Sequence, residues 1–392
     1  MAETKNIVFL GASYAGLGAS HYLLKHVYNQ LPTDPKVQYK AILVDASSKF
    51  FMRTVSPRAV MLPEQAPAEK ILVDIEPGFK QYGDKVSFVH AKATAWDERT
   101  RTVTLESGAG QQQTLSYWAL ILATGSRTQL AIYSLQGSTH EETAEKLRSV
   151  NAEIRSAKSI VISGGGPASV ETAGEIGEAL NGAAGWFSSR PANPKVKVTV
   201  VTSSSELLPM LRQSLSNQAE TYLHRVGVDV RYNTKIYSAE THDGKTTVML
   251  HDGEEIETDL YIPATGVEPL SAYVPPHLKD SKGYVVQNNS TLRVDAAGPR
   301  VYAVGDVGTY SDNGIFAILN SVPVLGANLK RDLLAMHADP AGKPQGEDRL
   351  YTQATKEMQI VPVGPSKGVG AIFGWRVPSI FVWLIKGRDY SK

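Results

Sequence analysis

Residues 6–16 read NIVFLGASYAG, a short apolar run that ends in a glycine turn. The turn, GASYAG at 11–16, follows the pattern GxGxxG with serine at the middle position, and a helix is predicted after it, from about Ala15 to Val27. In such strand–turn–helix units the first glycine makes the bend, the middle position lets a pyrophosphate approach the backbone, and the last glycine allows close helix packing. The helix N-terminus then favours the anion. Gly11, Ser13 and Gly16 therefore predict a dinucleotide-binding turn. A lone turn of this kind also occurs as an ordinary connection between a strand and a helix that binds no ligand.

Asp45 closes the next predicted strand, residues 41–44. An acid at this point of a dinucleotide fold accepts hydrogen bonds from ribose hydroxyls, and the alternative is an aspartate that caps the loop. The separation from Gly11 exceeds the usual ~20 residues. A loop that carries Pro32 and Pro35 accounts for the excess.

The same arrangement recurs at residues 164–169, GGGPAS, between a predicted strand at 159–162 and a predicted helix at 168–180. Gly164 and Gly166 keep the approach to a phosphate open, while Ser169 replaces the last glycine. Glu171 follows in what we expect to be the first helical turn, where the helix dipole alone favours a carboxylate unless the residue serves a cofactor. This internal duplication is the strongest indication in the sequence of how the chain is divided into domains.

The second strand of the repeat, predicted at 195–201, ends in TSSS at 202–205. A unit that prefers NAD usually has an acid at this point. Hydroxyls without a carboxylate tolerate a 2′-phosphate, but no arginine adjoins them. The sequence therefore predicts that NADPH is accepted at least comparably to NADH.

The composition of the chain limits its chemistry. Forty basic and 39 acidic side chains leave a formal charge of +1, which argues against wholesale capture of nucleic acid. There is no cysteine, which excludes disulfides, redox dithiols, thiolate metal sites and cysteine nucleophiles. Redox chemistry must therefore belong to a bound cofactor, and no metal site is predicted. Since no stretch reaches the ~18–20 apolar residues of a membrane span, we expect a cytoplasmic protein.

Three further strings make the pattern specific: ATGS at 123–126, ATGV at 264–267 and VYAVGD at 301–306. In this order with the two glycine turns, they resemble the pyridine nucleotide-disulfide oxidoreductase superfamily, flavoproteins with two dinucleotide-binding domains. Within it the chain resembles the apoptosis-inducing-factor-like branch, which includes ferroptosis suppressor protein and fungal homologues. The similarity to that branch rests on VETAGEI at 170–176, ELLP at 206–209, and the tail from GVG at 368–370 to KGRD at 386–389.

The resemblance implies an α/β fold with two Rossmann-like domains, arranged as in glutathione reductase, with β-meanders and a small C-terminal domain. The implied domains are 1–127 with 267–335 for FAD, 128–266 for NAD(P)H, and 336–392 at the C-terminus. The pattern along the chain also predicts short alternating strands over 85–122, a polar linker over 137–145, a strand at 301–304 and a helix near 318–336.

The resemblance also implies the residues that contact each cofactor. FAD would contact Gly11, Ser13, Gly16, Asp45, Arg58, Thr124, Gly125, Gly305 and Asp306, with Asp306 at the ribitol or pyrophosphate and Arg58 near the flavin. NAD(P)H would contact Gly164, Gly166, Ser169 and Gly266. Glu171 would lie beside the nicotinamide and is the candidate catalytic residue.

The chain departs from the superfamily where the disulfide reductases carry a cysteine pair, because residues 50–56 contain none. Disulfide reduction of the glutathione or thioredoxin type is therefore excluded. We expect an FAD-dependent NAD(P)H oxidoreductase with a small quinone-like acceptor. Two alternatives stay open: a flavin-dependent oxidase or monooxygenase that tailors a product of a biosynthetic pathway, and an NADH-sensing signalling protein like apoptosis-inducing factor.

The segment 372–385 contains four aromatic residues. It is either the packed end of the C-terminal domain or a wall of an acceptor pocket with an apolar face toward a membrane or lipid surface. Arg376, Lys386 and Arg388 flank it, as basic residues do in interfacial helices. Such contact would be peripheral, because the apolar run is too short to span a bilayer.

Overall fold

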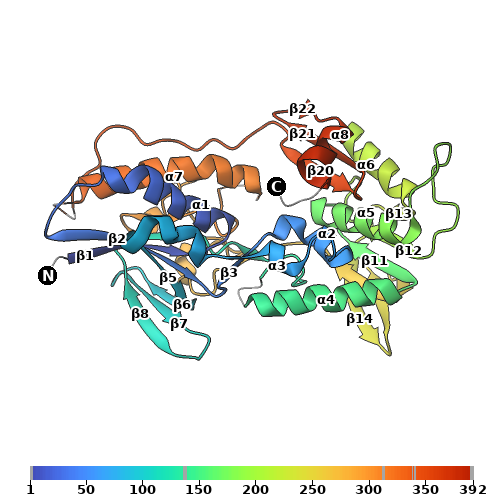
Figure 1. Cartoon of the computed structure of the whole chain (residues 1–392), viewed down its shortest axis with the longest axis horizontal. Coiled ribbons are helices and arrows are strands. Elements are labelled where there is room, and N and C mark those ends of the chain that lie inside the picture. Colours follow the sequence, from blue (N-terminus) through green and yellow to red (C-terminus); the bar gives the residue numbers. More distant parts are fainter. Residues whose placement is uncertain (1–2, 136–138, 311–313, 338, 340, 389–392) are drawn as a thin grey trace.

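The computed structural model describes residues 3–135, 139–310, 314–337, 339 and 341–388, and it has one parallel sheet in each half of an elongated molecule (Figure 1). The first sheet has the order β19-β9-β1-β2-β5, and each neighbouring pair is parallel. Residues 7–10 of the central strand are fully buried, as is typical of a parallel strand covered on both faces. The strands are β1 (Glu3–Leu10), β2 (Val37–Asp45), β5 (Val86–His90), β9 (Ala119–Leu122) and β19 (Val301–Ala303).

Two helices lie side by side over the first sheet, α1 (Tyr14–Tyr22) and α7 (Ile315–Ala335) (Figure 1). They approach closely because Gly326 of α7 faces Tyr22, and a Cβ at Gly326 would lie 2.2 Å from the tyrosine ring. α1 continues into the π-helical turn η1 (Leu23–Val27) and the short helix η2 (Tyr28–Gln30). The helices predicted after the first glycine turn and near residues 318–336 are confirmed.

The second sheet repeats the first with four parallel strands in the order β13-β12-β11-β17. Its strands are β11 (Ser159–Ser163), β12 (Lys197–Val201), β13 (Val228–Arg231) and β17 (Leu260–Pro263). Its helices are α4 (His140–Ser156), α5 (Pro167–Asn181) and α6 (Gln213–Arg225). The predicted second strand–turn–helix unit is confirmed by β11 and α5.

Each half carries an antiparallel meander. The first is β6 (Lys92–Asp97), β7 (Thr102–Glu106) and β8 (Gln112–Ser116), and the second is β14 (Ile236–His242), β15 (Lys245–Leu250) and β16 (Glu255–Thr258). The strands predicted over 85–122 are present, but the first and the last of them, β5 and β9, belong to the parallel sheet and not to the meander. The reason is clearest in β9, whose four residues are all buried, a pattern of parallel strands.

The predicted polar linker at 137–145 was also wrong from residue 140 onward, while its first residues lie outside the described ones. α4 begins at His140, and its buried residues Leu147, Val150 and Ile154 recur at helical spacing. Charged residues such as Glu141 and Glu145 occupy the exposed face and made the segment look like a linker. An amphipathic helix has this composition.

The C-terminal segment packs on the second half of the molecule. It comprises β20 (Gln359–Val363), β21 (Lys367–Ile372), β22 (Trp375–Arg376), α8 (Ser379–Val382) and the π-helical turn η7 (Trp383–Gly387). The loop after β20 touches α5 so closely that a Cβ at Gly174 would lie 2.5 Å from the backbone N of Gly364. The predicted domain boundaries remain a proposal.

Short elements complete the fold. They are β3 (Lys49–Phe51), η3 (Arg53–Val55), α2 (Ser56–Met61), α3 (Ala68–Ile71), β4 (Leu72–Asp74), η4 (Glu76–Lys85), β10 (Ser126–Arg127), β18 (Glu268–Pro269), η5 (Pro276–Leu278) and η6 (Asp295–Ala297). α2 shares one buried apolar cluster with α5. In the part of the chain that is described, no helix is both long enough and apolar enough to cross a bilayer.

Candidate cofactor sites

A cavity of about 290 Å³ opens at the carboxyl ends of β1, β2 and β9. Five of the residues predicted to bind FAD line it, namely Gly11, Ser13, Asp45, Thr124 and Gly125. The carboxyl edge of a parallel sheet is where such folds bind dinucleotides. The structure thus brings these residues together where the sequence predicts them.

The first glycine turn fits a pyrophosphate. Gly11 has a φ of +101°, and a Cβ there would lie 2.3 Å from the carbonyl O of Ala123. A Cβ at Gly16 would lie 1.8 Å from the carbonyl O of Gly11, so Gly16 allows helix packing and does not face the cavity. The first intrahelical bond runs from Leu17 N–H to Ser13 O, which leaves the N–H groups of the first turn for an anion.

Asp45 caps the loop after β2 and lies in the wall of the first cavity, and its contact with a ribose stays a prediction. Its carboxylate accepts hydrogen bonds from the N–H of Ala12 at 2.6 Å and of Ser47 at 2.8 Å, as a loop-capping residue does. It also lines the cavity. Burial raises the pKa of Asp45, and the two backbone hydrogen bonds oppose that rise.

Asp306 follows β19 and holds two side chains that line the same cavity. Ser126 Oγ donates to Asp306 Oδ2 at 2.9 Å, and Arg53 Nη1 lies 3.4 Å from the same oxygen. Gly305 has a φ of +80°, and its Cβ position would lie 2.8 Å from Ala15 Cβ. The sequence did not single out Arg53, although it lies in the same string as Arg58.

Arg58 lies elsewhere, in a buried ion pair between α2 and α5. Its Nη2 and Nε atoms donate to the two carboxylate oxygens of Glu175 at 2.7 and 3.0 Å. Arg58 and Glu175 are 2% and 0% exposed at their side chains. The basic side chain in the cavity wall is therefore Arg53, where the resemblance implied Arg58.

A second cavity of about 650 Å³ opens at the second glycine turn and reaches Gly164, Gly166 and Gly266. Gly164 has a φ of +115°, and a Cβ there would lie 2.7 Å from the carbonyl O of Ala264. Nothing lies within 4 Å of the Cβ position of Gly166, so this glycine leaves room for a phosphate. Ser169 is buried and donates to the carbonyl O of Gly166 at 2.8 Å, which directs its hydroxyl into its own turn.

Glu171 is the fifth residue of α5, just beyond the first helical turn in which it was expected. Its side chain is 4% exposed and accepts a hydrogen bond from Lys386 Nζ at 2.5 Å. Burial raises the pKa of Glu171, and the Lys386 ammonium acts in the opposite direction. A contribution to the helix dipole explains neither the burial nor the partner from η7.

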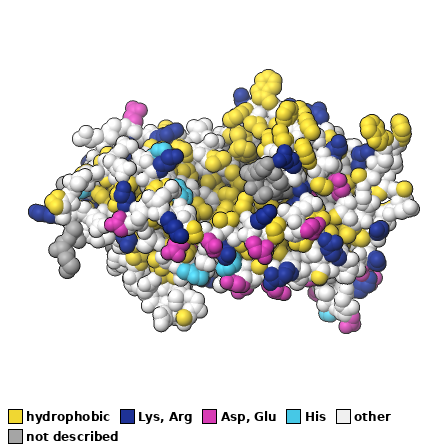
Figure 2. All heavy atoms as spheres, viewed as in Figure 1, with side chains coloured by type: hydrophobic (Ala, Val, Ile, Leu, Met, Phe, Trp, Pro, Cys, Tyr) yellow, Lys and Arg dark blue, Asp and Glu magenta, His cyan; other side chains and the backbone are white. Residues whose placement is uncertain are grey.

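Much of the aromatic segment near the C-terminus is exposed, although Val382 is buried and Trp383 is half-buried. Trp375 is 80% exposed, which contradicts the alternative of a packed end for this residue. We call the exposed residues the C-terminal apolar patch: Phe373, Trp375, Ile380, Phe381, Leu384 and Ile385. Figure 2 shows hydrophobic side chains gathered over this end of the molecule.

The comparisons with known proteins agree with this geometry. The sequence profile described as pyridine nucleotide-disulphide oxidoreductase matches residues 5–323. Oxidoreductase phnG of Penicillium herquei is 44% identical, over 98% of this chain and 94% of that protein. Oxidoreductase ptaL of Pestalotiopsis fici is 32% identical, over 97% of this chain and 95% of that one.

More distant relatives bear out the predicted branch and fold. Human ferroptosis suppressor protein 1 is 24% identical, over 98% of this chain and 93% of that protein. A NAD-dependent persulfide reductase from A. fulgidus superposes with a TM-score of 0.66 at 19% identity, over 94% of this chain and 64% of that one. The predicted α/β fold with two dinucleotide-binding domains is confirmed.

Proposed function

Because the chain belongs to the pyridine nucleotide-disulphide oxidoreductase family, we propose that it passes electrons from NAD(P)H through FAD to a quinone-like acceptor. The chain is an FAD- and NAD(P)H-dependent oxidoreductase by its family. The acceptor is the proposed part. The overall reaction would convert NAD(P)H, a proton and a quinone to NAD(P)⁺ and a hydroquinone.

FAD supplies the redox chemistry when bound, by taking a hydride from the nicotinamide and giving electrons to the acceptor. The protein contributes the two phosphate-binding turns, the acid at the end of β2, and Glu171 for the nicotinamide. With no cysteine in the chain, electrons have no protein dithiol to pass through. The acceptor must therefore reach the flavin itself.

The observation that carries the proposal is the position of η7. Lys386 contacts Glu171, while Leu384 and Ile385 of the same turn are 51% and 53% exposed. An apolar surface thus begins within one helical turn of Lys386, which contacts the residue proposed for the nicotinamide. An apolar, flat acceptor such as a quinone suits this approach better than a charged one.

The proposal predicts fast reoxidation of the reduced protein by quinones. The purified protein is reduced anaerobically with NADH or NADPH and then mixed with a panel of quinones, or with oxygen. Quinones are expected to reoxidise it faster than oxygen. Ile385→Ser should slow the quinone step and leave reduction by NADPH unchanged, whereas Leu350→Ser, an exposed leucine outside the patch, should change neither step.

Two other outcomes of this experiment would contradict the proposal and favour one of the alternatives. Faster reaction with oxygen, with or without a hydroxylated product, would favour the oxidase or monooxygenase alternative. A long-lived reduced complex with NAD⁺ that turns over with neither acceptor would favour a signalling role.

We also propose that the C-terminal apolar patch rests on a lipid surface that holds the acceptor. The patch combines aromatic and branched aliphatic side chains with the exposed Arg376 and Arg388 at its border. This is the composition of interfacial segments that insert apolar side chains between lipids and place cations at the headgroups. Large exposed apolar patches usually mark an interaction surface.

Vesicle co-sedimentation tests this surface. Wild-type protein should bind vesicles with anionic phosphatidylserine more strongly than neutral ones, and high salt should weaken the binding. Ile380→Ser combined with Phe381→Ser should abolish binding without changing FAD content. The control is Trp186→Ser with Phe187→Ser, two exposed aromatics in another loop. Equal loss in both double variants, or no binding at low salt, would refute the proposal.

A further inference from the structure

The loop after β13 places a cation beside the hydroxyls that end β12. The backbone N–H of Thr234 donates to Thr202 O at 2.9 Å, and that of Asn233 donates to Ser204 O at 3.0 Å. The next residue is Lys235, which lines the second cavity together with Thr202 and Ser203. No basic residue adjoins the TSSS string in the sequence, and the positive charge comes instead from the loop that follows the neighbouring strand.

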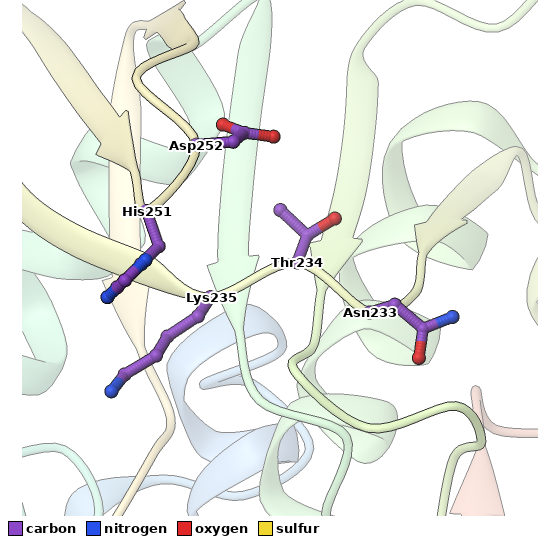
Figure 3. Close-up of a pocket in the computed structure, with 5 residues that line it drawn as sticks. All are labelled: Asn233, Thr234, Lys235, His251 and Asp252. Carbon is purple, nitrogen blue, oxygen red and sulfur yellow. The ribbon is translucent and has the colours of Figure 1, made fainter.

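His251 adds a second nitrogen base at the same edge. Its backbone N–H donates to Lys235 O at 2.9 Å, which joins the start of β14 to the end of β15. The two residues share a hollow that adjoins the second cavity, with Asn233, Thr234 and Asp252 in its wall. Figure 3 shows the side chains of Lys235 and His251 running in the same direction, away from those of Asp252 and Asn233.

The acids near Lys235 are engaged with another cation. Arg231 pairs with Glu254 at 2.7 Å and lies 4.0 Å from Asp252. Among the described residues, no carboxylate forms an ion pair with Lys235, and its side chain is exposed. Its ammonium is therefore available to an anion in the second cavity.

We propose that Lys235, with Ser203 and His251, binds the 2′-phosphate of NADPH. The end of the second strand of a dinucleotide fold is where the adenosine ribose lies, and there an acid favours NAD and a cation favours NADP. Here the acid is missing and Lys235 supplies the cation, so the arrangement favours the phosphorylated nucleotide. This inference rests on the proposed function only in that the second cavity binds the nicotinamide nucleotide.

The test measures binding of nucleotide fragments to the FAD-loaded protein, without any acceptor. By calorimetry, wild type should bind 2′,5′-ADP more tightly than 5′-AMP. Lys235→Ala should weaken 2′,5′-ADP binding about 10- to 150-fold, the range for one lost charge-assisted hydrogen bond, and leave 5′-AMP binding within about twofold. Lys245→Ala is the matched control, because it removes the same charge from the far end of the β14–β15 hairpin, where Asp259 holds it.

Three results would overturn the assignment: equal binding of both fragments by wild type, equal loss of both in Lys235→Ala, or the same loss in Lys245→Ala. Flavin content and the melting temperature of each variant show whether the protein is folded. In anaerobic stopped-flow experiments, the second-order rate constant of flavin reduction by NADPH, relative to that by NADH, should fall in Lys235→Ala as the affinity for 2′,5′-ADP does. Failure of quinones as acceptors would leave all of these results unchanged, so the two proposals fail separately.

Discussion

Replacing Arg58 with methionine is expected to destabilise the protein by about 3–5 kcal/mol, the cost of leaving one member of a buried ion pair without its partner. Glu175 is fully buried and receives two hydrogen bonds from the Arg58 guanidinium. Without them its carboxylate must stay charged in an apolar environment or take up a proton. Urea unfolding of the FAD-loaded protein measures the loss.

Two further variants make the result specific. Arg127→Met breaks an exposed pair with Glu268 and should cost only about 0.2–1 kcal/mol. Arg58→Met combined with Glu175→Leu removes both charges and should recover most of the lost stability, since apolar replacements of buried pairs are often neutral. If Arg58→Met and Arg127→Met lower the free energy of unfolding by similar amounts, burial does not determine how much the Arg58–Glu175 pair contributes to stability.

Glu171→Ala is expected to slow flavin reduction by NADPH about 10²-fold, the scale of losses when a reacting group is poorly positioned. Flavin content should not change, because Glu171 is not among the residues that line the first cavity. Stopped-flow measurement of flavin absorbance gives the rate.

The control for Glu171 is Glu178→Ala, two turns further along α5. Glu178 accepts a hydrogen bond from Ser366 Oγ at 3.3 Å and has no expected role with the nicotinamide, so reduction should stay at the wild-type rate. If Glu171→Ala leaves reduction unchanged and lowers stability by only ~0.3–1 kcal/mol, its role is confined to the helix dipole.

The sequence predicted best what is encoded locally. Each glycine turn lies between a strand and a helix that are adjacent in the chain, so the unit around Gly11 and the unit around Gly164 could both be placed from the sequence alone. The string around β19 was placed for the same reason, since Asp306 follows directly on an apolar run. Local pattern and turn chemistry suffice for such units.

The sequence could not predict contacts between distant segments. Nothing in the local pattern shows that Arg58 meets Glu175 and that Arg53 turns to the cavity, because this depends on how α2 packs against α5. The pairing of Glu171 with Lys386 joins residues 215 positions apart. Lys235 was missed because only the residues next to Ser203 in the sequence were considered, whereas the cation lies in the loop after the neighbouring strand, β13.

The pair of Arg58 and Glu175 also constrains how this protein can have changed over generations. A variant that loses the arginine alone has a free energy of unfolding that is several kcal/mol lower. This is a large part of the 5–15 kcal/mol by which a folded protein is ordinarily more stable than the unfolded chain. The route from this pair to an apolar one therefore passes through a poorly stable ancestor, whichever residue changes first. The residues at positions 58 and 175, where α2 packs against α5, should accordingly vary together among related proteins.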